Sequence, residues 1–145
     1  MKIGIISDHR GYELKEKIKK SIKNIDFIDY GTNSTKSVDY PDYAFKLGQA
    51  INENKVDLGI AICGSGIGMS IALNKVKNVR CARVTSIKDV KITKIDNNSN
   101  VIAFSSDINF DKVKRMIEEF VNTQFSSDER HIRRVNKIME YESKH

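Results

Sequence analysis

Short apolar runs alternate with longer amphipathic runs along almost the whole chain, and this alternation restricts the possible fold more than any other feature. The apolar runs have the length of buried strands, and the amphipathic runs carry apolar residues at helical spacing. Strands are predicted at Lys2–Ser7, Asp26–Tyr30, Leu58–Ile62, Val79–Val84 and Val101–Phe104, and helices at Tyr12–Asn24, Pro41–Glu53, Gly66–Lys75, Ile87–Ile95, Phe110–Gln124 and Ser127–Tyr141. Strands separated by helices form parallel sheets, so we predict a doubly wound, Rossmann-like α/β fold: a five-stranded parallel sheet in an α/β/α sandwich, with an extra C-terminal helix.

Length and composition favour a single domain over residues 1–145. The 145 residues are 39% hydrophobic, enough to bury a core without staples, and one proline and eight glycines leave no room for a linker. The two cysteines, Cys63 and Cys81, have neither C-x-x-C nor zinc-ligand spacing, so reduced thiols and no metal are expected. The N-terminal apolar run is too short for a signal peptide or a membrane span, which predicts a cytoplasmic protein.

The net charge of +6 does not by itself indicate nucleic acid. Lysines such as Lys15, Lys19 and Lys23 alternate with the apolar positions of the first predicted helix, as on a solvated face. No aromatic residues interleave with a basic stripe, so neither nucleic acid nor membrane is expected as a partner. A positive potential instead helps to attract a small anionic metabolite.

A thiol followed by alternating glycines stands at the end of the third predicted strand. The run is Cys63-Gly64-Ser65-Gly66-Ile67-Gly68, and a helix is expected to follow it. Glycines and the first turn of a helix leave backbone N–H groups free to bind negative oxygens, and the same environment favours a thiolate. Cys63 is therefore expected to act as a base or nucleophile; a small buried hydrophobic residue is the alternative.

Two other phosphate-binding loops do not fit this segment. A Walker A loop needs a lysine before its serine or threonine, and none lies between Gly64 and Ser70. The dinucleotide fingerprint requires a third glycine at the position that Met69 occupies here. It also requires the loop to follow the first strand, whereas this loop follows the third.

A second polar segment, Asp8-His9, follows the first predicted strand. Ligands of doubly wound sheets bind where the strand order reverses, which lies between strands one and three in the flavodoxin-like order 2-1-3-4-5. Asp8-His9 and Cys63-Gly64 should therefore meet in one crevice. Taken alone, Asp8 would be read as a helix cap and His9 as a surface residue. A phosphoacceptor receiver domain would need an aspartate where Cys63 stands.

Several ordered motifs together resemble the family of ribose-5-phosphate isomerase B and galactose-6-phosphate isomerase. These motifs are Ser7-Asp8-His9 with Gly11, Asp29-Tyr30-Gly31-Thr32, the run from Val38 to Ala44, the run from Ile62 to Gly68, Asn74-Lys75, Asn97 to Val101, and Arg130-His131 with Arg134-Val135. The resemblance covers nearly the whole chain.

The resemblance implies an isomerase of the pentose phosphate pathway that interconverts ribose 5-phosphate and ribulose 5-phosphate through an enediolate, without a cofactor. Cys63 would move the proton between neighbouring carbons, and Ser65 would support its thiolate by a hydrogen bond. Asp8 would bind the reacting hydroxyls, and Tyr40 would bind the sugar chain. The backbone from Gly64 through Gly66 and Ile67 to Gly68 would hold the developing negative charge.

Phosphate binding is expected at Arg130 and Arg134, which stand one helical turn apart, with His9 as a third donor. Asn97 also belongs to the substrate-binding residues that the resemblance implies. Without the resemblance, the two arginines would be read as a solvated helix face. Members of the family are dimers or tetramers with each active site built across an interface, so a homodimer or homotetramer is expected.

Two residues depart from the family's pattern. Asp96 stands where many members place the histidine that opens the furanose ring, and Asp107 stands at the position of an arginine that grips the phosphate. Arg83 or Lys94 is expected to compensate for the lost charge. Two alternatives to the pentose-phosphate isomerase follow: a related isomerase of galactose 6-phosphate or allose 6-phosphate, or a subunit of one, and a non-catalytic sugar-phosphate-binding protein.

Overall fold

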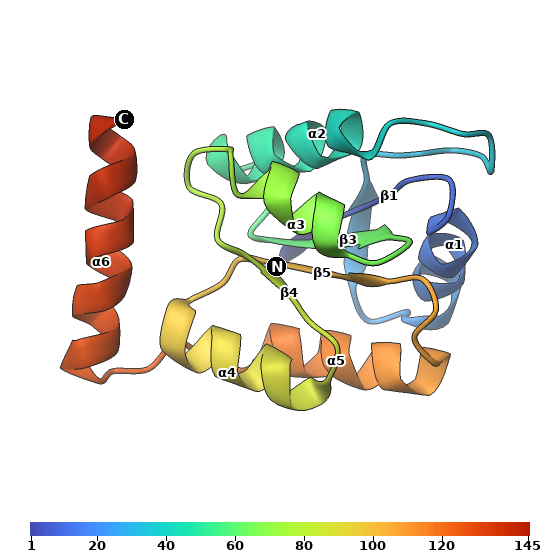
Figure 1. Cartoon of the computed structure of the whole chain (residues 1–145). Coiled ribbons are helices and arrows are strands. Elements are labelled where there is room, and N and C mark those ends of the chain that lie inside the picture. The colour runs from blue at the N-terminus through green and yellow to red at the C-terminus, as the bar shows by residue number, and fades with distance from the viewer.

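The computed structural model describes residues 1–145 and contains a sheet of five parallel strands covered by helices (Figure 1). The strands are β1 (Lys2–Ser7), β2 (Asp26–Asp29), β3 (Leu58–Cys63), β4 (Cys81–Arg83) and β5 (Val101–Ser105). The helices are α1 (Tyr12–Ser21), α2 (Tyr40–Asn52), α3 (Ile67–Leu73), α4 (Ile87–Asn97), α5 (Phe110–Asn122) and α6 (Glu129–Lys144). All strand pairs are parallel, which confirms the predicted doubly wound α/β fold.

The strand order differs from the expected one in its last two strands. The sheet runs β2-β1-β3-β5-β4, so β5 lies beside β3 and β4 forms the edge. A central strand of a parallel sheet is covered on both faces and needs a continuous apolar run. The run Val101–Phe104 is fully buried, whereas β4 has only three residues, all partly accessible or exposed, and ends in exposed Arg83. The reversal between β1 and β3 is retained, so the expected position of the site is unchanged.

Helices cover the sheet on two sides, which completes the predicted α/β/α sandwich. On one face, α2 and α3 pack on a cluster that includes Ile6, Ala61 and Cys63. On the other, α1, α4 and α5 pack on a cluster that includes Ile60 and Phe104. Alternate residues of β3 thus face opposite layers, and Cys63 faces the layer of α2 and α3.

Side-chain caps define the start of three helices. Ser86 Oγ accepts a hydrogen bond from Asp89 N at 3.1 Å, and Asn109 caps α5 in the same manner. At α6, Asp128 Oδ1 accepts from Arg130 N at 2.8 Å. These caps satisfy N–H groups that have no partner within the helix.

The extra C-terminal helix, α6, stands beside the sandwich (Figure 1). Among the helices and strands it packs mainly on α4, and Val135 is its only buried residue. Ile132, Ile138 and Tyr141 are exposed on α6, so much of its apolar surface has no partner within the chain. No helix has the length and apolarity needed to cross a bilayer.

Candidate active site

The turn between β3 and α3 brings a backbone amide onto the sulfur of Cys63. Gly66 N donates a hydrogen bond to Cys63 Sγ at 3.1 Å, and Cys63 is 5% exposed. Gly66 has a φ of 78°, and a Cβ there would lie 2.8 Å from Phe104 Cα. Only glycine fits this left-handed turn and close approach. The bond holds the sulfur in place at the end of β3.

Ser65 holds the loop rather than the sulfur. Its hydroxyl accepts a hydrogen bond from Ile67 N at 3.1 Å, so the expected hydrogen bond from Ser65 to Cys63 is not formed. The hydroxyl of a serine readily bonds an amide two residues ahead, and this local bond competes with the longer reach to the thiol. The carbonyl of Ser65 accepts from Arg83 Nε at 3.1 Å.

Of the five loop amides expected to bind an anion, those of Gly66 and Ile67 are used within the chain and the other three are not. Gly64 N, Ser65 N and Gly68 N donate no hydrogen bond within the chain. On the other side of the loop, the carbonyl of Gly64 accepts from Ser105 Oγ at 2.8 Å, and that of Cys63 accepts from Ser106 N at 2.9 Å. These bonds anchor the carbonyls and leave the amides available for an anion.

Asp8 and His9 lie next to this loop. The register that pairs Ser7 with Ile62, together with the bond from Asp8 N to Ile62 O at 3.1 Å, brings Asp8 beside Cys63. Asp8 Oδ1 accepts from Arg10 N and from Gly11 N at 3.0 and 3.1 Å, whereas its Oδ2 accepts no hydrogen bond within the chain. These bonds close the turn before α1, whose N-cap is Gly11 without a side-chain cap, so Asp8 is not the helix cap and one of its carboxylate oxygens is free for a substrate hydroxyl.

The ring of His9 is oriented by the backbone. His9 Nδ1 accepts a hydrogen bond from Val38 N at 3.2 Å. A neutral ring in this arrangement carries its proton on Nε2, which is then available as a donor.

Tyr40, the first residue of α2, covers the start of α3. A Cβ at Gly68 would lie 2.6 Å from Cζ of Tyr40, so the ring rests directly on this glycine. Tyr40 thus belongs to the same edge of the sheet as Cys63, and the glycine is needed because the aromatic ring occupies the place of its side chain.

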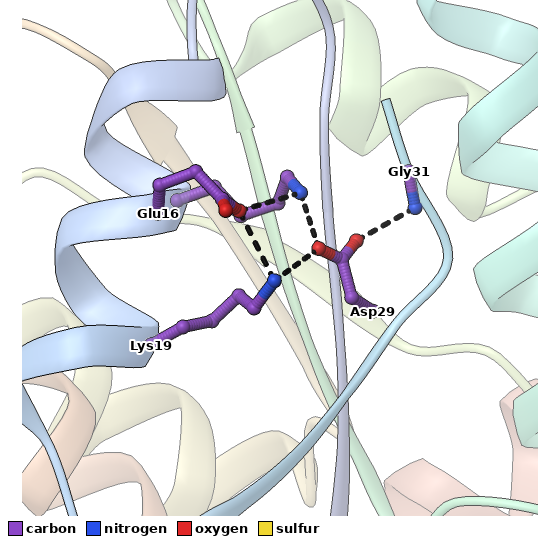
Figure 2. A network of polar contacts seen from close by, with 5 residues as sticks. Glu16, Lys19, Asp29 and Gly31 are labelled. Atoms are coloured by element: carbon purple, nitrogen blue, oxygen red, sulfur yellow. Dashed lines mark hydrogen bonds and ion pairs between the residues drawn. The ribbon is translucent and has the colours of Figure 1, made fainter. Parts of the chain in front are cut away.

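A network of ion pairs ties α1 to the end of β2 (Figure 2). The ammonium groups of Lys15 and Lys19 both bond to Asp29 Oδ2, and Asp29 Oδ1 accepts from Gly31 N at 2.8 Å. The side chain of Lys15 is fully buried, so its prediction as part of a solvated face was wrong. The carbonyl of Gly31 in turn accepts from Ser7 N at 2.8 Å. The network therefore braces the backbone that leads directly into Asp8.

The other predicted site residues lie near the amino-terminal ends of the strands, whereas Cys63 lies at the carboxyl ends. Asn97 ends α4 before β5 begins, whereas Cys63 pairs with Ser105 at the end of β5. The length of β5 separates the two positions by roughly 15 Å. Asn97 Oδ1 accepts from Thr93 Oγ1 at 3.3 Å and does not face the Cys63 loop.

Three further predicted site residues lie on the same side of the molecule as Asn97 and not near Cys63. They are Asp96, Arg130 and Arg134. Asp96 Oδ1 lies 3.6 Å from His131 Nε2, which connects α4 to α6. Arg130 bonds to its own helix cap, with its NH2 at 2.8 Å from Asp128 Oδ2, and Arg134 is exposed on α6. One chain thus carries the two halves of the predicted site at opposite ends of its strands and does not bring them together.

A large cavity also lies away from Cys63. It has a volume of about 720 Å³ and opens between α6 and the edge formed by β4 and the end of α4. Asn97, Cys81 and Tyr141 are among its lining residues. No group of three or more histidine, cysteine, aspartate or glutamate side chains is placed to hold a metal ion.

The two residues expected to compensate for the lost charge lie in different places. Arg83 contacts the Cys63 loop through Ser65, as described above. Lys94, in contrast, is 8% exposed with its Nζ 5.1 Å from the ring centroid of Phe120, so its assignment to the site was wrong. Helix α4 turns Lys94 toward α5, and the sequence pattern did not reveal this rotation. Desolvation, followed by the charge of Arg80, lowers the pKa of Lys94.

Sequence reasoning overlooked Arg10. A Cβ at Gly64 would lie 2.6 Å from Cζ and 2.9 Å from Nε of Arg10, so the guanidinium rests on the residue that follows Cys63. The available signal was its position in the same turn as Asp8 and His9. Asp107, whose N donates to Ser105 Oγ at 3.0 Å, is exposed at this same edge.

Known proteins resemble this chain over nearly its whole length. The sequence profile of the family described as Ribose/Galactose Isomerase matches residues 3–138. A protein of Bacillus subtilis named putative sugar phosphate isomerase YwlF is 40% identical over 148 residues, which cover 99% of each chain.

Solved structures show the same architecture. Ribose-5-phosphate isomerase B of Clostridium thermocellum superposes with a TM-score of 0.94 at 39% identity, covering 99% of both chains. Ribose-5-phosphate isomerase B of Mycoplasma genitalium, solved with bound ribulose-5-phosphate, gives a TM-score of 0.93 at 36% identity, covering 99% of this chain and 97% of the other. The chain therefore belongs to the ribose/galactose isomerase family, a family of sugar-phosphate isomerases.

Proposed function

We propose that the protein interconverts ribose 5-phosphate and ribulose 5-phosphate by proton transfer at Cys63. The observation that carries this proposal is the sulfur of Cys63, which lies 3.1 Å from Gly66 N on a loop with free amides and beside Asp8. A relative with 36% identity was solved with bound ribulose-5-phosphate, which supports the choice of substrate.

The reaction balances without a cofactor. The Cys63 thiolate takes the proton from C2 of the open-chain aldose, and the electrons of the C–H bond form the C1–C2 double bond as O1 becomes negative. Amides of Gly64, Ser65 and Gly68 stabilise this charge. The thiol returns its proton to C1, while the proton on O2 moves to O1 through the free carboxylate oxygen of Asp8, which leaves a carbonyl at C2.

Two copies of the chain are needed to complete the site. Three predicted residues lie at the ends of the strands opposite Cys63, namely Asn97, Arg130 and Arg134. They can therefore reach a substrate at Cys63 only from another molecule. We infer a homodimer, alone or paired into a tetramer, with each site across the interface. The apolar residues exposed on α6, together with Ile67 and Ile71 on α3, which are 50% and 59% exposed, support such an association.

Asp96 favours a second candidate, an isomerase of galactose 6-phosphate or allose 6-phosphate, or one subunit of a mixed oligomer. The resemblance to the family implies a ring-opening histidine at this position. His131, with Nε2 3.6 Å from Asp96 Oδ1, supplies an imidazole next to it and supports retention of the pentose reaction. A non-catalytic sugar-phosphate-binding protein is less consistent with a thiol held at an amide.

The decisive experiment is a turnover assay of the purified protein with ribose 5-phosphate, allose 6-phosphate and galactose 6-phosphate side by side. The pentose reaction predicts the largest kcat/KM for ribose 5-phosphate. A larger value for a hexose phosphate would replace the first candidate by the second, and binding without turnover of any of the three would favour the non-catalytic protein.

A further inference from the structure

We propose that Arg10 binds the phosphosugar in the site around Cys63, an inference that rests on the proposed function. Arg10 stands in the turn between β1 and α1, directly after Asp8 and His9. Its backbone is fixed there because Arg10 N donates to Asp8 Oδ1 at 3.0 Å. The residue is thus placed by the same carboxylate that the proposed reaction uses.

The guanidinium of Arg10 lies against Gly64 of the Cys63 loop. A Cβ at Gly64 would overlap with one terminal nitrogen and would lie 2.6 Å from Cζ and 2.9 Å from Nε. The planar head therefore occupies the space that any side chain at Gly64 would fill. Gly64 is the residue next to Cys63, so a permanent positive charge is held beside the free amides of the loop.

This cation has no acidic partner within the chain. None of the side-chain hydrogen bonds or ion pairs involves the guanidinium of Arg10, in contrast to Arg130, which is bonded to Asp128. Asp8 receives the backbone amide of Arg10 rather than its side chain. Asp107 is at the same edge but forms no ion pair with it. All five N–H donors of the guanidinium are consequently available to a ligand.

The location of Arg10 suits a role in binding the ligand rather than in activating the thiol. Cys63 faces the layer of α2 and α3, whereas Ile62 before it faces the layer of α1. Arg10 reaches Gly64 from the turn before α1, where a Cβ of Gly11 would contact Ile62. The charge therefore lies across the loop from the sulfur and suits the phosphate of the substrate rather than the proton transfer. Guanidinium groups bind phosphate through paired hydrogen bonds.

The test compares Arg10→Ala, Arg10→Gln and Arg10→Lys with the wild-type protein. Measured quantities are kcat and KM for ribose 5-phosphate and the inhibition constant of inorganic phosphate. Loss of the guanidinium should raise both KM and the inhibition constant about tenfold or more, with kcat changed less than about threefold, as for one lost charge-assisted hydrogen bond. Arg10→Lys should recover part of the affinity. Lys20→Ala, which removes an exposed charge farther along α1, should change neither constant.

Two results would overturn the role of Arg10. One is an unchanged KM and phosphate inhibition in both the Ala and Gln variants, with circular dichroism verifying their fold. The other is a fall in kcat at constant KM together with slower alkylation of Cys63, because Arg10 would then act on the thiol. If the wild-type protein turns over no phosphosugar, the proposed function fails separately. The role of Arg10 is then decided by the rise in Tm that ribose 5-phosphate produces, which Arg10→Ala should abolish.

Discussion

Gly66 N lies 3.1 Å from Cys63 Sγ and donates a hydrogen bond to it. The bond exists because Gly66 adopts a left-handed conformation that turns the chain back toward the end of β3. A residue with a Cβ cannot replace it, since Phe104 lies against the same position. The sulfur thus receives its donor from the backbone, which leaves the side chains around it free to contact a substrate.

Substitution of Cys63 should abolish turnover and preserve binding. Cys63→Ala removes the proposed base, so kcat for ribose 5-phosphate should fall by about 10²–10⁴-fold. The dissociation constant of ribose 5-phosphate, measured by calorimetry, should change little, because a base acts in the transition state. Equal loss of turnover and binding would contradict this role. Cys81→Ala is the matched control and should retain kcat.

The two thiols should differ in reactivity. Burial raises the pKa of the Cys81 thiol to about 12, although a hydrogen bond from Ser70 acts in the opposite direction. Cys81 is therefore protonated throughout the neutral range, and only thiolates react with iodoacetamide. The labelling is done at pH 7.5, which is about one unit below the pKa of an ordinary cysteine thiol. Mass spectrometry of the labelled peptides should find modification of Cys63 well before that of Cys81. Labelling of Cys81 first would show that Cys63 is not the reactive thiol.

Mixing two impaired variants should restore activity. Arg134→Ala should raise KM, so the variant is slow at low substrate concentration, and Cys63→Ala is inactive. In a mixed dimer with sites across the interface, one site receives both intact residues and the other receives neither. Random exchange of subunits should then restore about one quarter of the wild-type rate.

The control for this experiment is a mixture that cannot complement. Cys63→Ala combined with the double variant Cys63→Ala/Arg134→Ala should stay inactive after exchange. Absence of recovery in the first mixture, with subunit exchange verified by mass spectrometry, would contradict a shared site.

The free energy of unfolding should depend on pH through the ionisation of Asp29. Burial acts to raise the pKa of Asp29, but hydrogen bonds from Lys15, Lys19 and Gly31 N outweigh it and hold the pKa below the ordinary value. The resulting stability is present above the unfolded-state pKa of about 3.9 and is lost as the pH falls toward the lower folded-state value. Asp29→Asn should reduce the free energy of unfolding at pH 7 by about 1–3 kcal/mol.

Urea unfolding at pH 7 and pH 3 measures this effect. The difference between wild-type protein and Asp29→Asn should shrink at pH 3, because the carboxylate is then partly protonated in the unfolded chain. Glu53→Gln, at the exposed pair with Lys55, is the control and should leave unfolding unchanged at either pH. A difference that is constant with pH would mean that the ionised form of Asp29 is not the stabilising one.

Local patterns of the sequence were sufficient for most of the elements and for one half of the site. The apolar run of β3 followed by alternating glycines predicted a strand, a turn with free amides and a thiol at its end, because each depends on neighbouring residues. The placement of Asp8 beside Cys63 followed from the rule for parallel sheets. The order of β4 and β5 did not, because the position of a strand in the sheet depends on which strand the helices cover on both faces, and that is a property of the whole fold.

Sequence alone thus determined which residues follow each strand and which chemistry they offer, since backbone geometry and side-chain type are local properties. Only the tertiary structure decided which of these residues meet. It placed the guanidinium of Arg10 on Gly64 and turned Lys94 toward Phe120. It also separated Asn97 from Cys63 by the length of β5. These distances depend on how distant segments pack around one sheet, and no local pattern encodes that packing.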